Sequence, residues 1–224
     1  MAVAVIVYGK SGSGKSRSIK NFAEDEIYLV NVLGKPLPFK GSFKYTTRGD
    51  NLQTICEGLA KMPMNAAVID DFGYVMTNMF MRGHGGGDQF KLFNQIGDTV
   101  WNFISFIQNL PNDKIVYLLM HEDMDDYGNT KLATIGKLLD QKVKIEGMVT
   151  VCLRATVQNE RHVFQTNSPT GVDIAKSPEG MFAETYIDND LKEVDRAVRE
   201  YWGMAPLVAV KVEKPGKAEK KGER

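Results

Sequence analysis

Four continuous runs of apolar residues stand out along the chain, and they have the pattern of strands buried on both faces. Residues 2–8, 27–32, 66–69 and 115–120 are rich in Val, Ile, Leu and Ala and carry few polar side chains. Strands inside a parallel sheet show this pattern because other elements cover both of their faces. We therefore expect a mostly parallel central sheet.

Apolar residues at steps of three and four predict helices between these strands. Residues 51–62 show this spacing and stop before Pro63, and the pattern is longest in the segment that begins at Phe90. The alternation of strands and helices indicates an α/β fold with three layers. Further helices are expected at 16–24, 132–140 and 189–202.

Glycine and proline interrupt the periodic segments at several places. Residues 34–49 are rich in Gly, Pro and Lys and predict an irregular excursion with a short hairpin. The glycine triplet at 85–87 predicts a mobile loop over 79–89, because successive glycines disfavour regular structure. Two strand-like runs separated by residues 158–160 indicate a C-terminal β-hairpin.

Length and composition favour one well-packed domain. The chain has 224 residues, of which 43% are hydrophobic and 25% are charged, as in an ordinary globular protein. We expect the domain to cover residues 1–203. The extension at 204–224 is expected to end in a disordered basic tail, because it contains few apolar residues.

Charge and cysteine content narrow the cellular setting. The formal net charge is zero, so nucleic-acid binding requires a local basic patch. Cys56 and Cys152 are too few for a disulfide framework and lack metal-ligand spacing, which favours a reducing compartment. The apolar run at 2–8 is too short for a membrane span and lacks signal-peptide features. We expect a cytoplasmic protein without a membrane partner.

A glycine-rich segment, GKSGSGKS at residues 9–16, stands between the first strand and the first helix. This spacing in this context is the P-loop pattern, whose backbone amides wrap a phosphate. Lys15 is expected to contact the β- and γ-phosphates, and Ser16 to hold Mg²⁺. The absence of an Asn-Lys-x-Asp segment favours ATP over GTP. The residues expected to bind the nucleotide are Gly9, Lys10, Ser11, Gly12, Ser13, Gly14, Lys15, Ser16 and Arg17.

Acidic residues follow two of the buried strands. Asp70 has the position of the Walker B carboxylate, which lies beside the magnesium ion. Asp71 stands where many P-loop ATPases carry a glutamate that polarises the attacking water, so it is a candidate base, or a cap for the following turn. Glu122 is a second candidate base, or a solvated side chain.

Four segments of the chain resemble the RecA-like P-loop ATPases. More specifically, they resemble small phage-encoded ATP-binding proteins, including the Sak group, which is linked to single-strand annealing and recombination. The segments read GKSGSGKS at 9–16, AAVIDDF at 66–72, YLLMHED at 117–123 and AKSPEGMFAETYIDNDL at 175–191. The first two are specific for the superfamily, and the last two suggest the phage group. The similarity spans roughly residues 1–202 and, for a phage-encoded chain, implies the host-cell cytoplasm.

The resemblance implies that the strand at 115–120 lies between the P-loop strand and the strand of Asp70. The end of such a strand carries a polar sensor for the γ-phosphate or the water, and His121 is the candidate. RecA-type proteins also carry a catalytic glutamate after an early strand, but residues 28–36 contain no acid. The base is then Asp71, Glu122 or an unrecognised group, or hydrolysis is slow.

RecA-like proteins assemble head to tail, so the resemblance implies a homo-oligomer, either a ring or a filament. A Lys or Arg of one subunit then reaches the γ-phosphate bound by its neighbour and stabilises the transition state. Lys176 is the first candidate for this finger, and Arg154 and Arg161 follow.

The resemblance also implies contacts with single-stranded DNA from the loops that follow the Asp70 strand and the sensor strand. The first loop region contains Arg82, His84, Phe90 and Lys91, which combine phosphate contact with base stacking. The region of the second loop, 124–131, is acidic and would repel DNA, so an ordinary surface connection is favoured there.

Three functions follow from these observations. The first is an ATP-hydrolysing protein of phage DNA recombination, acting with single-stranded DNA and a phage partner protein. The second is a nucleotide-gated scaffold with little turnover, which the missing glutamate supports. The third is a small-molecule or nucleotide kinase, against which the scattered arginines argue, since such kinases usually close an arginine-rich lid.

Overall fold

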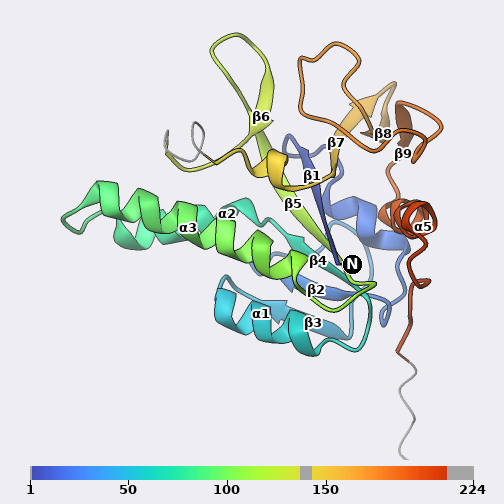
Figure 1. The fold of residues 1–224 in the computed structure, drawn as a ribbon, viewed down its shortest axis with the longest axis horizontal. Coiled ribbons are helices and arrows are strands. Elements are labelled where there is room, and N and C mark those ends of the chain that lie inside the picture. The colour runs from blue at the N-terminus through green and yellow to red at the C-terminus, as the bar shows by residue number, and fades with distance from the viewer. Residues whose placement is uncertain (1, 137–142, 211–224) are drawn as a thin grey trace, which may run out of the picture.

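The computed structural model describes residues 2–136 and 143–210 of the chain. Within this part, nine strands form one mixed sheet in the order β3-β2-β4-β5-β1-β7-β8-β9, with β6 paired to β5 (Figure 1). The strands are β1 (Val3–Gly9), β2 (Tyr28–Asn31), β3 (Tyr45–Arg48), β4 (Ala66–Asp70), β5 (Ile115–Met124), β6 (Thr130–Leu132), β7 (Val151–Gln158), β8 (Arg161–Gln165) and β9 (Tyr186–Asp188).

The strands from β3 to β7 in this order run parallel, and β6, β8 and β9 are antiparallel to their neighbours. The mostly parallel sheet and the C-terminal hairpin are therefore confirmed, as is the place of β5 between β1 and β4. The register sets Gly9 beside His121 and Asn31 beside Asp70. The carboxyl ends of the central strands thus meet at one edge of the sheet.

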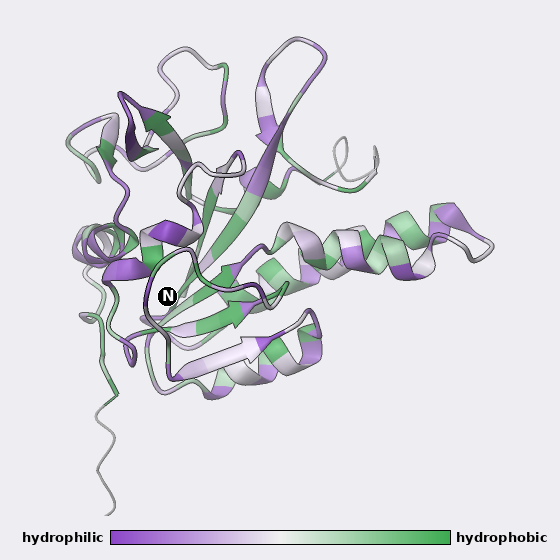
Figure 2. Cartoon of the chain, turned by 180° about the vertical axis from the view of Figure 1, so that it is seen from behind, coloured by the Kyte–Doolittle hydropathy of each residue, from purple (hydrophilic) through white to green (hydrophobic). Residues whose placement is uncertain are grey.

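Helices cover both faces of the sheet, which gives three layers. Strand β1 is buried along its whole length, because successive side chains point into two different cores. Figure 2 shows hydrophobic residues along the central strands and a mixture of hydrophobic and hydrophilic residues along the helices. One face carries α1 (Leu52–Lys61), α2 (Gly73–Gly83) and α3 (Gln89–Gln108), and the other carries the 3₁₀ helix η1 (Ser16–Asn21) and α5 (Leu191–Trp202). A short 3₁₀ helix, η2 (Ile145–Met148), precedes β7.

Side chains cap the amino-terminal ends of α1, α3 and α5. The side chain of Asn51 accepts a hydrogen bond from the backbone N–H of Thr54 at 3.1 Å at the start of α1. Asp190 does the same for Lys192 at the start of α5, at 3.0 Å. Helix α5 ends at Gly203, which has a positive φ of 61° and so stops the helix with no steric cost.

Two local predictions were wrong, and a third, the helix expected at 132–140, was wrong over the residues that the structure describes. The helix expected at 16–24 is the shorter η1, which ends in an i to i+3 hydrogen bond from the Phe22 N–H to Ile19 O. The expected hairpin within 34–49 is absent, because the excursion returns the chain to the same end of the sheet and β3 pairs parallel to β2. Residues 132–136 are not helical, since Leu132 ends β6; residues 137–140 lie outside the described part.

The loop predicted over 79–89 was also wrong in extent. Helix α2 continues to Gly83, and only a short turn separates it from α3. Glycine at position 83 lets the two helices approach, because a Cβ there would lie 2.7 Å from Cδ1 of Leu92. The glycine triplet is therefore the turn of a helical hairpin, which Figure 1 shows projecting beyond the sheet.

The first part of the predicted extension packs on the domain. Met204 and Leu207 contact the core beneath α5, and the backbone N–H of Val208 donates to Oδ1 of Asn65 at 3.0 Å. The predicted tail lies outside the described residues from position 211 onward. In the described part of the chain, no helix combines the length and hydropathy that crossing a membrane requires.

Candidate functional site

The segment that follows β1 at the carboxyl edge of the sheet is a tight loop, residues 9–16, called the glycine-rich loop below. Gly12 and Gly14 have positive φ angles of 78° and 101°, which residues with a side chain rarely adopt. At Gly14 there is also no space, since a Cβ would lie 2.8 Å from Nδ1 of His162. Both the backbone conformation and the packing of β8 therefore require glycine here.

Lys15 is buried within this loop. Its Nζ donates hydrogen bonds to the carbonyl oxygens of Gly9 at 2.8 Å and Lys10 at 2.9 Å. Burial lowers the pKa of Lys15 to about 8, although nearby Asp71 and Asp70 favour the charged form. The ammonium group thus contacts only neutral carbonyl oxygens. A phosphate oxygen would be a charged acceptor, which forms a stronger hydrogen bond with the ammonium group.

Ser16 joins the glycine-rich loop to the end of β4. Its Oγ donates a hydrogen bond of 2.8 Å to Oδ1 of Asp70, a residue that is only 4% exposed. Burial raises the pKa of Asp70, against the opposing hydrogen bond from Ser16. A hydroxyl and a carboxylate are the hard oxygen donors that Mg²⁺ prefers, and Mg²⁺ completes its shell with water. Among the described residues no cluster of three or more His, Cys, Asp or Glu converges.

Asp71 adopts a left-handed φ of 60°, which is uncommon without glycine but tolerated by aspartate. Its Oδ2 lies 2.5 Å from Nζ of Lys35, and its Oδ1 lies 3.4 Å from Nε2 of His121. Burial by itself raises the pKa of Asp71, but the hydrogen bonds from His121 and Lys35 outweigh burial and lower it. Asp71 is therefore a buried anion held between two basic side chains.

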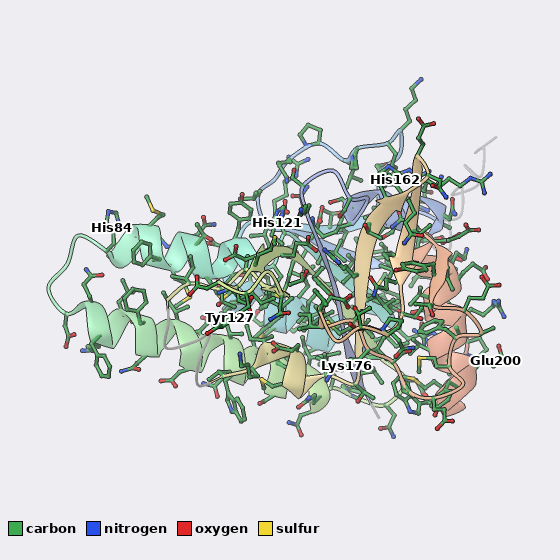
Figure 3. The ribbon with its side chains drawn as sticks, turned by 90° about the horizontal axis from the view of Figure 1, so that it is seen from above. His84, His121, Tyr127, His162, Lys176 and Glu200 are labelled. Carbon is green, nitrogen blue, oxygen red and sulfur yellow. The ribbon has the colours of Figure 1, made fainter. Side chains whose placement is uncertain are left out.

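These groups surround a cavity of about 350 Å³, the size of a small-molecule site. Figure 3 shows two of its histidines, His121 from β5 and His162 from β8, on the same side of the molecule. The structure thus brings together the predicted loop, Asp71 and His121, and Ser16 links Asp70 to them. The lining residues are Ser11, Gly12, Gly14, Lys15, Ser16, Arg17, Lys35, Pro38, Asp71, His121 and His162.

Glu122 and Arg154 do not line this cavity but bind each other. The carboxylate of Glu122 accepts two hydrogen bonds from Arg154, at 2.9 Å and 3.0 Å, and its side chain is 3% exposed. The hydrogen bonds raise the pKa of Arg154. Because Glu122 is on β5 and Arg154 on β7, the pair bridges the two strands that flank β1. A role as base or as finger would require this pair to open.

The other two finger candidates also lie outside the cavity of their own chain. The backbone of Lys176 pairs with that of Cys152 in β7, and Figure 3 shows Lys176 well apart from His121. Arg161, at the start of β8, lines a second cavity of about 380 Å³ together with Arg17.

The predicted DNA-binding residues gather around the turn of the α2–α3 hairpin. Arg82 lies in the last turn of α2 and forms an ion pair of 2.8 Å with Asp50. His84 lies in the turn, and Phe90 and Lys91 lie in the first turn of α3. Phe90 is 69% exposed, so its ring is available for a stacking contact.

Three residues that line the cavity were not predicted from the sequence, namely Lys35, Pro38 and His162, and two of them are polar. His162 contacts the glycine-rich loop through Nδ1, which lies 3.0 Å from the carbonyl oxygen of Ser13. The sequence predicted the hairpin that contains His162, but only the pairing of β8 with β7 shows that this histidine faces the glycine-rich loop. Lys35 stands in an irregular segment, and only the proximity of β2 to β4 places it beside Asp71.

Comparison of the chain with models of protein families gives no match, and comparison with curated proteins gives none either. The residues and the geometry of the site therefore carry the functional assignment.

Proposed function

We propose that this chain is a RecA-like P-loop ATPase of the phage type, which binds ATP with Mg²⁺ beside the glycine-rich loop and hydrolyses it. The hydrogen bond of 2.8 Å between Ser16 and Asp70 carries the proposal, because it joins a P-loop hydroxyl to a strand-end carboxylate. The place of β5 between β1 and β4 supports the RecA-like assignment.

Each polar group of the cavity has a role in this proposal. Lys15 exchanges its bonds to Gly9 and Lys10 for bonds to the β- and γ-phosphates. Ser16 and Asp70 hold Mg²⁺, which would neutralise charge on the phosphate oxygens. Asp71 and His121 orient the attacking water. Its oxygen bonds to the γ-phosphorus while the bond to the ADP oxygen breaks, and the proton that the water loses passes to the carboxylate of Asp71.

The biological setting of this ATPase is proposed to be DNA recombination or single-strand annealing. The α2–α3 hairpin supports it, because its turn region combines Arg82, His84 and Lys91 with the exposed ring of Phe90. In an assembled ring or filament, a basic residue of the neighbouring subunit would complete the site, with Lys176, Arg154 and Arg161 as candidates.

A nucleotide-gated scaffold is the second candidate. The observation that favours it is the ion pair between Asp71 and Lys35, together with the contact of Asp71 with His121. A carboxylate that two basic groups stabilise is a weak base, so ATP would bind while turnover stays low.

The test is ATP hydrolysis by the purified chain with and without single-stranded DNA. We expect DNA to raise the rate several-fold, and Lys15→Ala to lower it about 10²- to 10³-fold, the usual effect of losing one charge-stabilising donor. Lys20→Ala, an exposed change in η1, is the matched control and should retain the rate.

Other outcomes separate the alternatives. Failure of the wild-type chain to bind ATP would refute the proposal. Binding that requires Lys15 but gives negligible turnover would favour the scaffold. A Lys15-dependent rate that ignores DNA would refute the recombination setting alone.

A further inference from the structure

The position of Lys35 is determined by the strands beside it. Lys35 lies four residues beyond β2, whose last residue, Asn31, is level with Asp70 of β4. The side chain of Asn31 donates a hydrogen bond of 2.7 Å to the carbonyl oxygen of Lys35. The Gly34 N–H returns a hydrogen bond of 3.2 Å to the carbonyl oxygen of Asn31. These bonds hold Lys35 against the edge where the glycine-rich loop lies.

The two side chains of the ion pair between Lys35 and Asp71 differ in their exposure to water. The Asp71 side chain is 4% exposed, whereas that of Lys35 is 54% exposed, and the two charged groups lie 2.5 Å apart. The Lys35 ammonium reaches into the cavity from solvent and can leave Asp71 without a large change in its own hydration. The Asp71 carboxylate, by contrast, is fixed in the wall of the cavity.

The charges around the cavity suit a triphosphate. Lys15 and Lys35 line the cavity as cations, and the acidic residues Asp70 and Asp71 stand at the end of β4. Lys15 currently contacts carbonyl oxygens of its own loop, and Lys35 contacts Asp71. A lysine ammonium is a compact charge with three donors, which suits the oxygens of a terminal phosphate.

We propose that Lys35 binds the terminal phosphate of ATP and thereby distinguishes ATP from ADP. On ATP binding, Lys35 exchanges the carboxylate of Asp71 for oxygens of the γ-phosphate. This exchange leaves Asp71 free to accept a hydrogen bond from the attacking water. The inference rests on the proposed ATPase function. Lys35 would contact the γ-phosphate from within the same chain, a role that the resemblance to RecA-like proteins assigns to a Lys or Arg of a neighbouring subunit.

A purely structural role for Lys35 predicts a different result. If the ion pair with Asp71 only anchors the loop, its loss affects ATP and ADP alike, because both share the α- and β-phosphates. The ratio of the two affinities is therefore the informative quantity, and overall affinity is not.

The experiment measures binding of ADP and of a non-hydrolysable ATP analogue in the presence of Mg²⁺. Lys35→Ala should weaken analogue binding about 10- to 100-fold, the range for one hydrogen bond to a charged group, and should leave ADP binding nearly unchanged. Lys35→Arg, which keeps the charge, should restore part of the loss. Lys40→Ala, an exposed lysine in the same excursion, is the matched control and should affect neither nucleotide.

The outcomes separate this inference from the proposed function. Equal weakening of both nucleotides in Lys35→Ala, or no weakening of either, would overturn the role of Lys35 while leaving the ATPase proposal intact. Wild-type protein that binds neither nucleotide, or binds both without needing Lys15, would overturn the proposed function and the role of Lys35 together.

Discussion

The two ends of the parallel sheet both bury charged side chains, but they satisfy them differently. At the amino end, Arg199 of α5 pairs with Asp195, which also accepts a hydrogen bond of 2.9 Å from the hydroxyl of Tyr117. The remaining donors of Arg199 reach the backbone oxygens of Asn65, Asp113 and Ala205, each at 2.9 Å. At the carboxyl end, Lys15 contacts only neutral carbonyl oxygens of its own loop.

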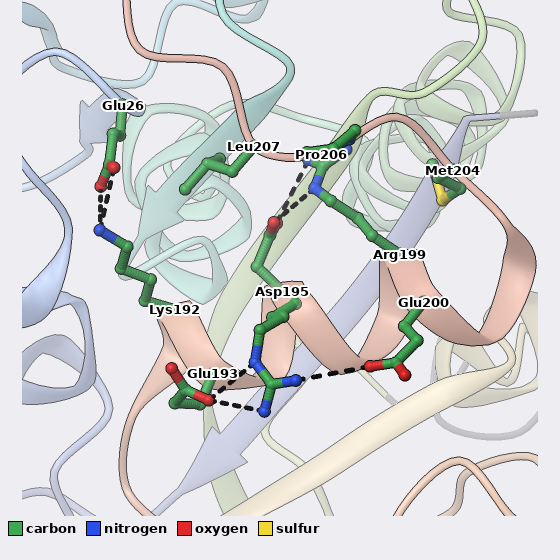
Figure 4. Close-up of a pocket in the computed structure, with 10 residues that line it drawn as sticks. Glu26, Lys192, Glu193, Asp195, Arg199, Glu200, Met204, Pro206 and Leu207 are labelled. Carbon is green, nitrogen blue, oxygen red and sulfur yellow. Dashed lines mark hydrogen bonds and ion pairs between the residues drawn. The ribbon is translucent and has the colours of Figure 1, made fainter.

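Arg199, Asp195 and Tyr117 form what we call the amino-end network. A cavity beside this network extends the comparison. It measures about 440 Å³, larger than the cavity at the glycine-rich loop. Its charged lining residues pair among themselves: Glu26 pairs with Lys192, as Figure 4 shows. Glu193 and Glu200 both pair with Arg196. Volume alone therefore does not identify a ligand site. A site for an anion is better recognised where cations lack anionic partners or can exchange them.

Of the predicted effects, the largest is the loss of stability caused by removing the Arg199 side chain, which tests whether the charged groups at the amino end are structural. Arg199→Met leaves Asp195 buried without its cation, which should lower the free energy of unfolding by about 3–5 kcal/mol. Urea unfolding followed by circular dichroism measures it. Arg196→Met, on the exposed side of the same helix, is the control and should cost less than about 0.5 kcal/mol. A loss below about 1 kcal/mol for Arg199→Met would show that the amino-end network is not structural.

A second experiment concerns the carboxyl end of the sheet and distinguishes between the two candidate bases there. Asp71 lines the cavity, whereas Glu122 is held by Arg154. Asp71→Asn should therefore slow single-turnover hydrolysis about 100-fold, within the range for a lost general base, with ATP still bound. Glu122→Gln should change the rate by a few-fold at most. The reverse ranking would identify Glu122 as the base and would mean that its pair with Arg154 opens during turnover.

The smallest effect concerns the tyrosine of the amino-end network. Tyr117→Phe removes one hydrogen bond to Asp195 and leaves the ion pair with Arg199, so it should cost about 1 kcal/mol of unfolding free energy. The same urea titration measures it. Tyr127→Phe, at a side chain that is 91% exposed, should change nothing. Equal stability of the two variants would indicate that Arg199 alone satisfies Asp195.

Local patterns were sufficient for much of the fold and for part of the site. The buried strands and the glycine-rich loop were identified from contiguous residues, because burial on both faces and a tight turn each impose their pattern locally. Helix α2 was missed at its end, because the glycine triplet was assigned to a long loop. In the structure, α2 continues to Gly83, where the lack of a Cβ leaves room for the side chain of Leu92 in α3.

The partners of the charged groups depended on strands that are distant in the sequence. Lys35 reaches Asp71 because β2 lies beside β4, and His162 reaches the glycine-rich loop because β8 folds back against β7. Glu122 looked like a free acid in the sequence, and it meets Arg154 because their strands flank β1. The spacing of glycine, lysine and aspartate along the chain specified which chemistry to expect. Strand order selected the side chains that meet there, since hydrogen bonds and ion pairs form over a few ångströms whatever the separation in sequence.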